Sequence, residues 1–392
     1  MQIKNAVVFT LEQGFVEKDI YIQDGCFVEA EQYKETGQIL DGTGCYLIPG
    51  LVDVHFHGCA GEDFSDGTPE GLAKIGRYEL ENGITSICPA SMTLSEEMLS
   101  DICKNAASYA KEQEVYLKNV QNGAVDGDEL GSRLCGIHLE GPFISMEKKG
   151  AQNPDYIQRP NVEMFHRLQV AADGLVKLIT IAPEVEGAEE FIKTLAEKVH
   201  ISVGHTASDY ASAYQAFELG ADHVTHFFNA MPSFTHRAPG VFGAAYDQKH
   251  VMAELICDGI HVDASAVRVM FGLFGKERMV LISDTVRATG MPDGEYVLGG
   301  LPITVKGKLA TLHDGTIAGS ATNLMDCVRT VVKRGIPLET AIRCASYNAA
   351  KSIGVDDVCG SIEAGKYGDC VLLEKESLAT KTVILGGQIV EV

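Results

Sequence analysis

The 392-residue sequence lacks several features that would place it in a particular class of protein. No apolar run approaches the roughly 18 residues that a membrane-spanning helix requires. The first residues, MQIKNAVVFTLEQGF, have neither the basic start nor the continuous apolar core of a secretory signal. We therefore expect a cytoplasmic protein without a membrane partner.

Basic residues are scarce, since 32 Lys and Arg stand against 54 Asp and Glu and the formal net charge is −22. Such a surface repels nucleic acid and anionic lipid, and no run of Lys or Arg offsets the repulsion. We predict neither as a partner. A small anionic substrate remains compatible with this charge if Arg, His or backbone N–H groups are placed locally.

Several chemical motifs are also missing. None of the 11 cysteines forms a C-x-x-C pair, so we predict buried thiols in a reducing compartment instead of a zinc ribbon or disulfides. No G-x-G-x-x-G or P-loop pattern follows the first apolar run, which argues against an open nucleotide-binding sheet. No G-x-S-x-G elbow is present, and Cys59 in HFHGCAG is more simply a packing residue than a nucleophile.

A regular alternation of apolar runs and helical patterns fills residues 51–351. Nearly continuous apolar strands are typical of a parallel sheet that is buried on both faces. Eight successive β–α steps predict an α/β fold, specifically a TIM-type (β/α)8 barrel. The eight apolar runs are 51–58, 84–91, 134–142, 175–183, 200–206, 223–230, 251–259 and 279–285.

Helical patterns separate these runs, and the amino-acid composition changes after the eighth run. Residues 286–320 are rich in Gly and β-forming residues, and we expect a long insertion there. Helices at about 322–335 and 338–351 should then complete the barrel. The helices expected between the strands include 68–82, 95–113, 185–198, 208–220 and 263–275.

Both ends of the chain have a β-type pattern broken by turns. The Asp24–Gly25 pair is a hairpin signal. Neither end is long enough to close a core alone, so we predict that residues 1–50 and 352–392 together form one small β-sandwich domain beside the barrel.

Metal-ligating side chains recur where the predicted strands end. Reactive groups in a TIM barrel lie at the carboxyl ends of its strands. Imidazole and carboxylate ligands in combination suit zinc or ferrous iron. The candidate ligands are His55, His57, Glu140, His205, His226 and Asp284.

The spacing of the histidines refines this set. His55 and His57 are two residues apart and should project from one face of a strand. His138 shares a face with Glu140 but lies one layer deeper, which suits a hydrogen-bonding partner better than a ligand. The earlier histidines near His205 and His226 fall at odd intervals and should point away. We assign the other histidines to the surface or to packing: His166, His200, His223, His250 and His313.

This set of residues suits hydrolysis of an amide. A bound metal lowers the pKa of water from 15.7 to about 7 and can polarise the carbonyl. A neighbouring carboxylate can accept the proton of the water and pass it to the departing amine. Asp284, after the last strand, is our candidate for that acid/base.

The segment PGLVDVHFHG, between β-rich ends, resembles the amidohydrolase superfamily. The superfamily usually has a carboxylated lysine on strand four, whereas here Lys177 lies near the start of that strand and an acidic residue appears on strand three, in GIHLEGPF. That departure, with VGHT, THFFNAMP, ICDGIHV and ISDT, is similar to the N-acetylglucosamine-6-phosphate deacetylases over essentially the whole chain.

The resemblance implies specific roles. Glu140, His205 and His226 would form the main metal site, with Asp284 as acid/base. Family members bind one or two metals, and the retained His55 and His57 offer a second site bridged by Glu140. The implied cofactor is therefore one or two divalent ions, with zinc favoured and iron or manganese as alternatives. The implied substrate-binding residues are Ala151, Asn229, Ala230, Arg237, His261, Ile317, Ala318 and Gly319.

The implied reaction converts N-acetylglucosamine 6-phosphate to glucosamine 6-phosphate and acetate. In the family the phosphate-binding arginine can come from the neighbouring subunit, so the resemblance also implies a homodimer. Three alternatives stay open: the galactosamine epimer as substrate, a cyclic-amidase-like hydrolase that would not need Arg237 and His261, and a non-catalytic scaffold, which would typically have lost its metal ligands.

Overall fold

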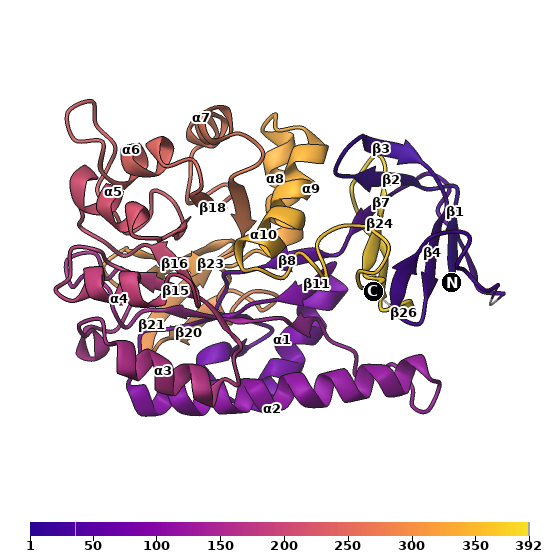
Figure 1. Ribbon diagram of the computed structural model, residues 1–392, viewed down its shortest axis with the longest axis horizontal. Coiled ribbons are helices and arrows are strands. Elements are labelled where there is room, and N and C mark those ends of the chain that lie inside the picture. Colours follow the sequence, from indigo (N-terminus) through magenta and orange to yellow (C-terminus); the bar gives the residue numbers. More distant parts are fainter. Residues whose placement is uncertain (36, 391–392) are drawn as a thin grey trace.

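The computed structural model describes residues 1–35 and 37–390, which form two parts lying side by side (Figure 1). The larger part is a barrel of parallel strands wrapped by helices, and the smaller part is a pair of β-sheets that combines the first and the last described strands. The predicted fold class, a TIM-type barrel with a small β-sandwich domain, is confirmed. Among the described residues, no helix is both long and apolar enough to cross a membrane.

The small β-domain consists of a four-stranded sheet, β5-β4-β1-β6, and a six-stranded sheet, β26-β25-β24-β7-β2-β3. Between the sheets lies a separate apolar core that includes Ile3, Ile22, Leu47 and Leu372. The strands are β1 (Gln2–Lys4), β2 (Val7–Thr10), β3 (Gly14–Glu17), β4 (Ile20–Gln23), β5 (Cys26–Val28), β6 (Ile39–Asp41), β7 (Cys45–Pro49), β24 (Cys370–Glu374), β25 (Thr380–Leu385) and β26 (Gln388–Val390).

The two chain ends pair directly, as the sequence predicted. Strand β7 runs antiparallel to β24, with Ile48 opposite Val371. The expected hairpin also forms, because Asp24 and Gly25 join β4 to β5 with φ angles of 51° and 80°. Positive φ at both positions matches the twist of the flanking strands.

Each of the eight predicted apolar runs contains a barrel strand, and the strand cores are buried throughout. The strands form the parallel sheets β13-β11-β8 and β12-β14-β15-β16-β17-β18-β19. They are β8 (Leu51–Asp53), β11 (Ile84–Ile87), β12 (Ala90–Ser91), β13 (Arg133–Leu134), β14 (Ile137–Glu140), β15 (Val176–Ile181), β16 (His200–Val203), β17 (His223–Val224), β18 (Met252–Ile256) and β19 (Met279–Ile282).

Backbone hydrogen bonds just beyond the first and last strands close the ring. The N–H of Asp284 donates to the carbonyl of His55 at 2.9 Å, and the N–H of His57 donates to the carbonyl of Thr285 at 2.7 Å. Three of the six candidate ligands therefore lie at this seam, and barrel closure fixes their positions.

A helix follows each apolar run, as predicted. Helix α2 continues to Gln121, and the helix expected over 338–351 is divided into α9 and α10 at Ser346. Helices α3 and α6 follow the third and sixth runs, where we had predicted no bounds. The sequence of α6, GVFGAAYD, contains two glycines and has weak helix propensity, which tertiary packing overrides. The helices are α1 (Pro69–Glu81), α2 (Glu96–Gln121), α3 (Val162–Ala171), α4 (Ala188–Leu195), α5 (Tyr210–Glu218), α6 (Gly240–Asp247), α7 (Ala264–Phe274), α8 (Leu324–Lys333), α9 (Leu338–Ala345) and α10 (Tyr347–Ser352), with 3-10 turns η1 (Phe64–Asp66) and η2 (Pro154–Tyr156).

The predicted insertion after the eighth strand is an antiparallel sheet that reaches the end of the barrel. Its strands are β20 (Gly294–Leu298), β21 (Leu301–Lys306), β22 (Leu309–Leu312) and β23 (Ile317–Ser320). A bridge between Thr285 and Ser320 ties β23 to the segment after β19. A two-stranded ribbon of β9 (Gly58–Cys59) and β10 (Glu62–Asp63) follows the first barrel strand.

Candidate active site

The six predicted ligand residues meet at the carboxyl end of the barrel. Glu140 is the last residue of β14, and each of the others follows a strand by two to four residues. All six are buried, with whole-residue exposure between 0% and 6%. The other five are His55, His57, His205, His226 and Asp284.

One group is formed by Glu140, His205 and His226. Oε1 of Glu140 lies 3.1 Å from Nε2 of His205 and 3.0 Å from Nε2 of His226. The two imidazole nitrogens are themselves 3.0 Å apart. Three potential ligand atoms therefore face a single point from three different strands.

This donor set fits a divalent cation. Nδ1 of His205 is 3.0 Å from the carbonyl oxygen of Lys148, which can only accept a hydrogen bond, so in neutral His205 the lone pair is on Nε2. Nitrogen and carboxylate lone pairs that converge without protons between them repel one another unless a cation binds. Three protein ligands with a free fourth position are typical of a catalytic zinc site.

A second group lies on the other side of the Glu140 carboxylate. Nε2 of His55 is 3.2 Å from Oε1 of Glu140, and Nε2 of His57 is 3.3 Å from Oε2. Oδ1 of Asp284 lies 3.4 Å from Nε2 of His57 and 3.8 Å from Nε2 of His55. Nδ1 of His57 faces the carbonyl oxygen of Ala90 at 3.1 Å, so this ring also presents Nε2. Glu140 is placed to bridge both groups.

The Glu140 carboxylate is held by its surroundings. Burial alone raises the pKa of Glu140, but the charges of His55 and His205 and the hydrogen bonds from the histidines hold it well below its usual value. Nε2 of Gln152 donates to Oε2 of Glu140 at 2.6 Å, and the backbone N–H of Thr93 fixes Gln152 at 2.7 Å. Gln152 lies in a loop without a periodic pattern, so its contact with Glu140 was not predictable from the sequence.

Backbone conformation turns three of these side chains into the site. His205, His226 and Asp284 have φ angles of 45°, 26° and 51°, which non-glycine residues adopt rarely and at functional sites preferentially. Because of these positive φ angles, side chains do not simply alternate between two faces from His200 to His205 or from His223 to His226, as our prediction assumed. His223, which alternation directed away from the site, lies in the barrel interior with Nε2 3.3 Å from Oε1 of Glu254.

His138 also lies inside the barrel. Its ring packs edge-on against His55 with centroids 4.6 Å apart, and Nε2 lies 2.8 Å from Oγ1 of Thr180. Burial lowers the pKa of His138 to about 3, so the ring is neutral. Its predicted role as a hydrogen-bonding partner of the ligands stays a prediction.

A cavity of about 500 Å³ opens above the two groups. Arg237 does not line it and lies on the exposed loop 232–239, while Ala318 is fully buried beside it. The cavity brings together the other predicted substrate residues, namely Ala151, Asn229, Ala230, His261, Ile317 and Gly319.

Two of these residues have clear physical constraints. Nδ1 of His261 lies 2.8 Å from Oδ2 of Asp258; although burial lowers the pKa of His261, this interaction raises it above the ordinary value. His261 can therefore be a cationic donor. Gly319 has φ of 64°, and a Cβ there would lie 2.6 Å from a side-chain carbon of Val286 and 2.8 Å from the carbonyl oxygen of Asp284. Only glycine fits this wall of the cavity.

Sequence reasoning missed two cations at the cavity. Lys148 and Lys149 precede Gly150 in the loop after β14, and both line the cavity. They were inconspicuous because paired lysines in a loop are usually solvated. In a chain with net charge −22, they are local positive charges beside a site that already holds several carboxylates.

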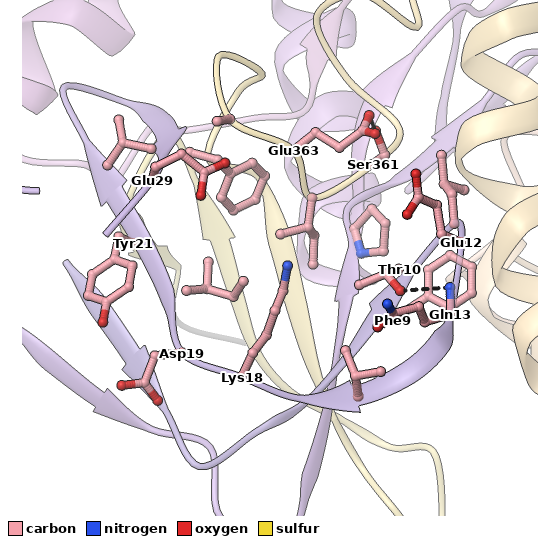
Figure 2. Close-up of a pocket in the computed structure, with 18 of the residues that line it drawn as sticks. Phe9, Thr10, Glu12, Gln13, Lys18, Asp19, Tyr21, Glu29, Ser361 and Glu363 are labelled. Carbon is pink, nitrogen blue, oxygen red and sulfur yellow. Dashed lines mark hydrogen bonds between the residues drawn. The ribbon is translucent and has the colours of Figure 1, made fainter. Parts of the chain in front are cut away.

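Another cavity, of about 610 Å³, lies in the small β-domain (Figure 2). Lys18 extends into it, and Glu12, Glu29 and Glu363 stand around it. Among the described residues, the groups that could hold a metal ion all lie in the barrel. The chemistry is therefore assigned to the barrel cavity.

Comparison with known proteins agrees with the geometry of the barrel. The sequence model of the Amidohydrolase family matches residues 46–390. The chain is 35% identical to N-acetylglucosamine-6-phosphate deacetylase of Bacillus subtilis, over 98% of this chain and 96% of that protein. It is 32% identical to N-acetylgalactosamine-6-phosphate deacetylase of Escherichia coli O157:H7, over 96% of each chain.

Solved structures extend the similarity to the whole fold. N-acetylglucosamine-6-phosphate deacetylase from Pasteurella multocida superposes with a TM-score of 0.88 and 29% identity, over 99% of each chain. A mutant of the Mycobacterium smegmatis deacetylase in complex with N-acetyl-D-glucosamine 6-phosphate gives a TM-score of 0.86 and 31% identity, covering 99% of this chain and 98% of that one.

Proposed function

The chain belongs to the amidohydrolase family, and we propose that it hydrolyses N-acetyl-D-glucosamine 6-phosphate to D-glucosamine 6-phosphate and acetate. The observation that carries the proposal is the convergence of Glu140, His205 and His226 within 3.1 Å beneath a cavity with cationic residues. The near-complete alignment with deacetylases of this specificity supports the substrate.

The proposed cofactor is a divalent metal, one or two ions per chain. Glu140, His205 and His226 would hold the first ion, and His55 and His57 would hold a second, with Glu140 between them. Zinc suits these nitrogen-rich ligands best, with iron or manganese as alternatives. A bound divalent metal supplies an activated water at neutral pH and polarises the amide carbonyl.

Asp284 is the proposed acid/base. Its side chain lines the cavity, and its Oδ1 lies within 3.4 Å of Nε2 of His57. It accepts a proton from water as the water oxygen bonds to the acetyl carbon. It then delivers that proton to the sugar nitrogen as the C–N bond breaks, leaving acetate and a free amine.

The phosphate would be bound by cationic side chains. His261 is a donor within the cavity, and Lys148 and Lys149 add positive charge at its rim. Arg237 is exposed on its own loop, so we propose that it reaches the cavity of a partner subunit in a homodimer. Asn229 and the backbone near Ala230 would bind the sugar.

The galactosamine epimer is the second candidate, because the E. coli relative with that specificity is almost as similar as the B. subtilis protein.

We further propose that the reaction takes place in the cytoplasm. All 11 cysteines are free thiols, and nine of them are buried, which suits a reducing compartment.

The test is acetate release from four sugars: N-acetylglucosamine and N-acetylgalactosamine, each with and without the 6-phosphate. The purified protein is assayed as isolated, after chelation and after return of zinc, iron or manganese. We expect chelator-sensitive activity on the 6-phosphates alone, and the faster epimer identifies the substrate. No activity on any of the four after metal return would contradict the proposal.

A further inference from the structure

Glu254 is a buried carboxylate that neither the cavity nor the proposed reaction uses. It lies in the middle of β18, is 0% exposed and does not line the cavity. Its Oε2 lies 2.9 Å from Nδ1 of His55 and accepts the backbone N–H of His226 at 3.0 Å. Its Oε1 faces His223 at 3.3 Å. One side chain thus contacts both candidate metal groups from below.

The contact with His55 determines which ring nitrogen faces the metal site. A carboxylate only accepts hydrogen bonds, so the proton of a neutral His55 ring lies on Nδ1. The lone pair then lies on Nε2, a fully buried atom without a hydrogen-bond partner among the described residues. That atom is 3.2 Å from Oε1 of Glu140, on the side of His57 and Asp284.

Charge provides a second argument. Two divalent ions bring four positive charges into a buried site, where uncompensated charge is costly. Glu140 and Asp284 supply two negative charges at the site itself. Glu254 adds a third directly behind His55, and hydrogen bonding to it makes the imidazole a stronger ligand.

We propose that Glu254 is the positioning residue that allows His55 and His57 to hold a second divalent ion. The inference rests on the proposed function, since it concerns the occupancy of the same site. It predicts two ions per chain, and it makes binding of the second ion depend on a carboxylate that is not one of its ligands.

Substitutions can separate the two contributions of Glu254. Glu254→Gln keeps the shape and leaves an amide oxygen to accept from His55, but it removes the charge. Glu254→Leu removes both. We expect two ions in the wild type, a second ion bound at least about tenfold more weakly in Glu254→Gln, and one ion in Glu254→Leu.

The measurement is metal content per chain by mass spectrometry in zinc-buffered solution, with folding checked by circular dichroism. Glu79→Gln and Glu79→Leu are the controls for substitution of a buried glutamate, because Glu79 is equally buried and its carboxyl oxygens form no hydrogen bond with the ligand histidines. They should retain two ions. His55→Ala should retain one, as Glu254→Leu does.

The proposal would be overturned by one ion in the wild type, by unchanged affinity for the second ion in Glu254→Gln, or by equal metal loss in the Glu79 controls. Three ions in the wild type would also overturn it, because the His55–His138–Glu254 group would then be a metal site in its own right. If Glu254→Leu does not fold, Glu254→Gln still decides. Metal counting needs no substrate, so its failure and failure of the deacetylation assay are distinguishable.

Discussion

Glu79 offers a prediction whose size follows from burial alone. It lies on the inner face of α1, is 0% exposed, and neither carboxyl oxygen has a hydrogen-bond partner among the described residues. Burial, reinforced by the nearby Asp53, raises the pKa of Glu79 from 4.5 to about 8. The folded protein therefore keeps this proton through a pH range in which the unfolded chain loses it.

The sign of the effect on stability follows from proton counting. Between pH 4.5 and pH 8 the folded state binds one more proton at Glu79 than the unfolded state, so the free energy of unfolding falls as pH rises. The slope is about 1.4 kcal/mol per pH unit, which amounts to about 4 kcal/mol by pH 8. Glu79→Gln has no proton to lose and should escape this loss.

Thermal unfolding measured from pH 5 to pH 8 tests the reasoning. With an unfolding entropy of roughly 0.8 kcal/mol/K for a chain of this length, we expect Glu79→Gln to melt about 5 °C above the wild type at pH 8. The difference should shrink to about 1 °C at pH 5. Asp53 is titratable in both proteins, so its contribution to the pH dependence largely cancels when the wild type and Glu79→Gln are compared. Glu79→Asp, which keeps a buried carboxyl, should keep the pH dependence. Parallel curves for the wild type and Glu79→Gln would refute the argument.

Three further predictions concern the site. Asp284→Asn should lower kcat by about 10²- to 10⁴-fold without loss of metal, as measured by steady-state kinetics and metal analysis; an unchanged kcat would remove the acid/base assignment. Arg237→Ala should mainly raise KM for the 6-phosphate, and mixing it with Asp284→Asn should restore low-KM activity, because each mixed dimer has one complete site; no recovery from mixing would exclude a contribution from the partner. Asp258→Asn should lower the pKa of His261, so the loss of kcat/KM as pH rises should begin at lower pH, and an unshifted profile would contradict a cationic His261.

The barrel was predictable because burial on both faces makes each strand a nearly continuous apolar run, and eight such runs recur along the chain. The predicted strand ends also identified the six residues that meet around Glu140. The direction of the side chains at the strand ends was not predictable in the same way. The alternation of side chains along a strand holds only for an extended backbone, and His226 follows its strand with φ of 26°. We predicted no bounds for helix α6, because its helicity depends on packing against the barrel and not on its own sequence.

Residues that influence the site through another residue could not be recognised from the sequence. Glu254 lies in the apolar run VMAELICDG, where a single carboxylate resembles an exposed strand position. Gln152 lies in a loop, and its contact with Glu140 depends on how that loop folds over β14. Arg237 lies outside the cavity in its own chain, and no property of one chain predicts where a partner would place it.

The pairing of β7 with β24 also constrains how the protein can be made. Ile48 leaves the ribosome about 320 residues before Val371, its neighbour in the sheet. At about 10 residues per second, the first strands wait roughly half a minute with an unpaired edge. During that time neighbouring nascent chains on one messenger RNA can compete for the edge. Removal of the last 25 residues would take away β24, β25 and β26 and leave β7 with a permanently unpaired edge, although β7 is synthesised first.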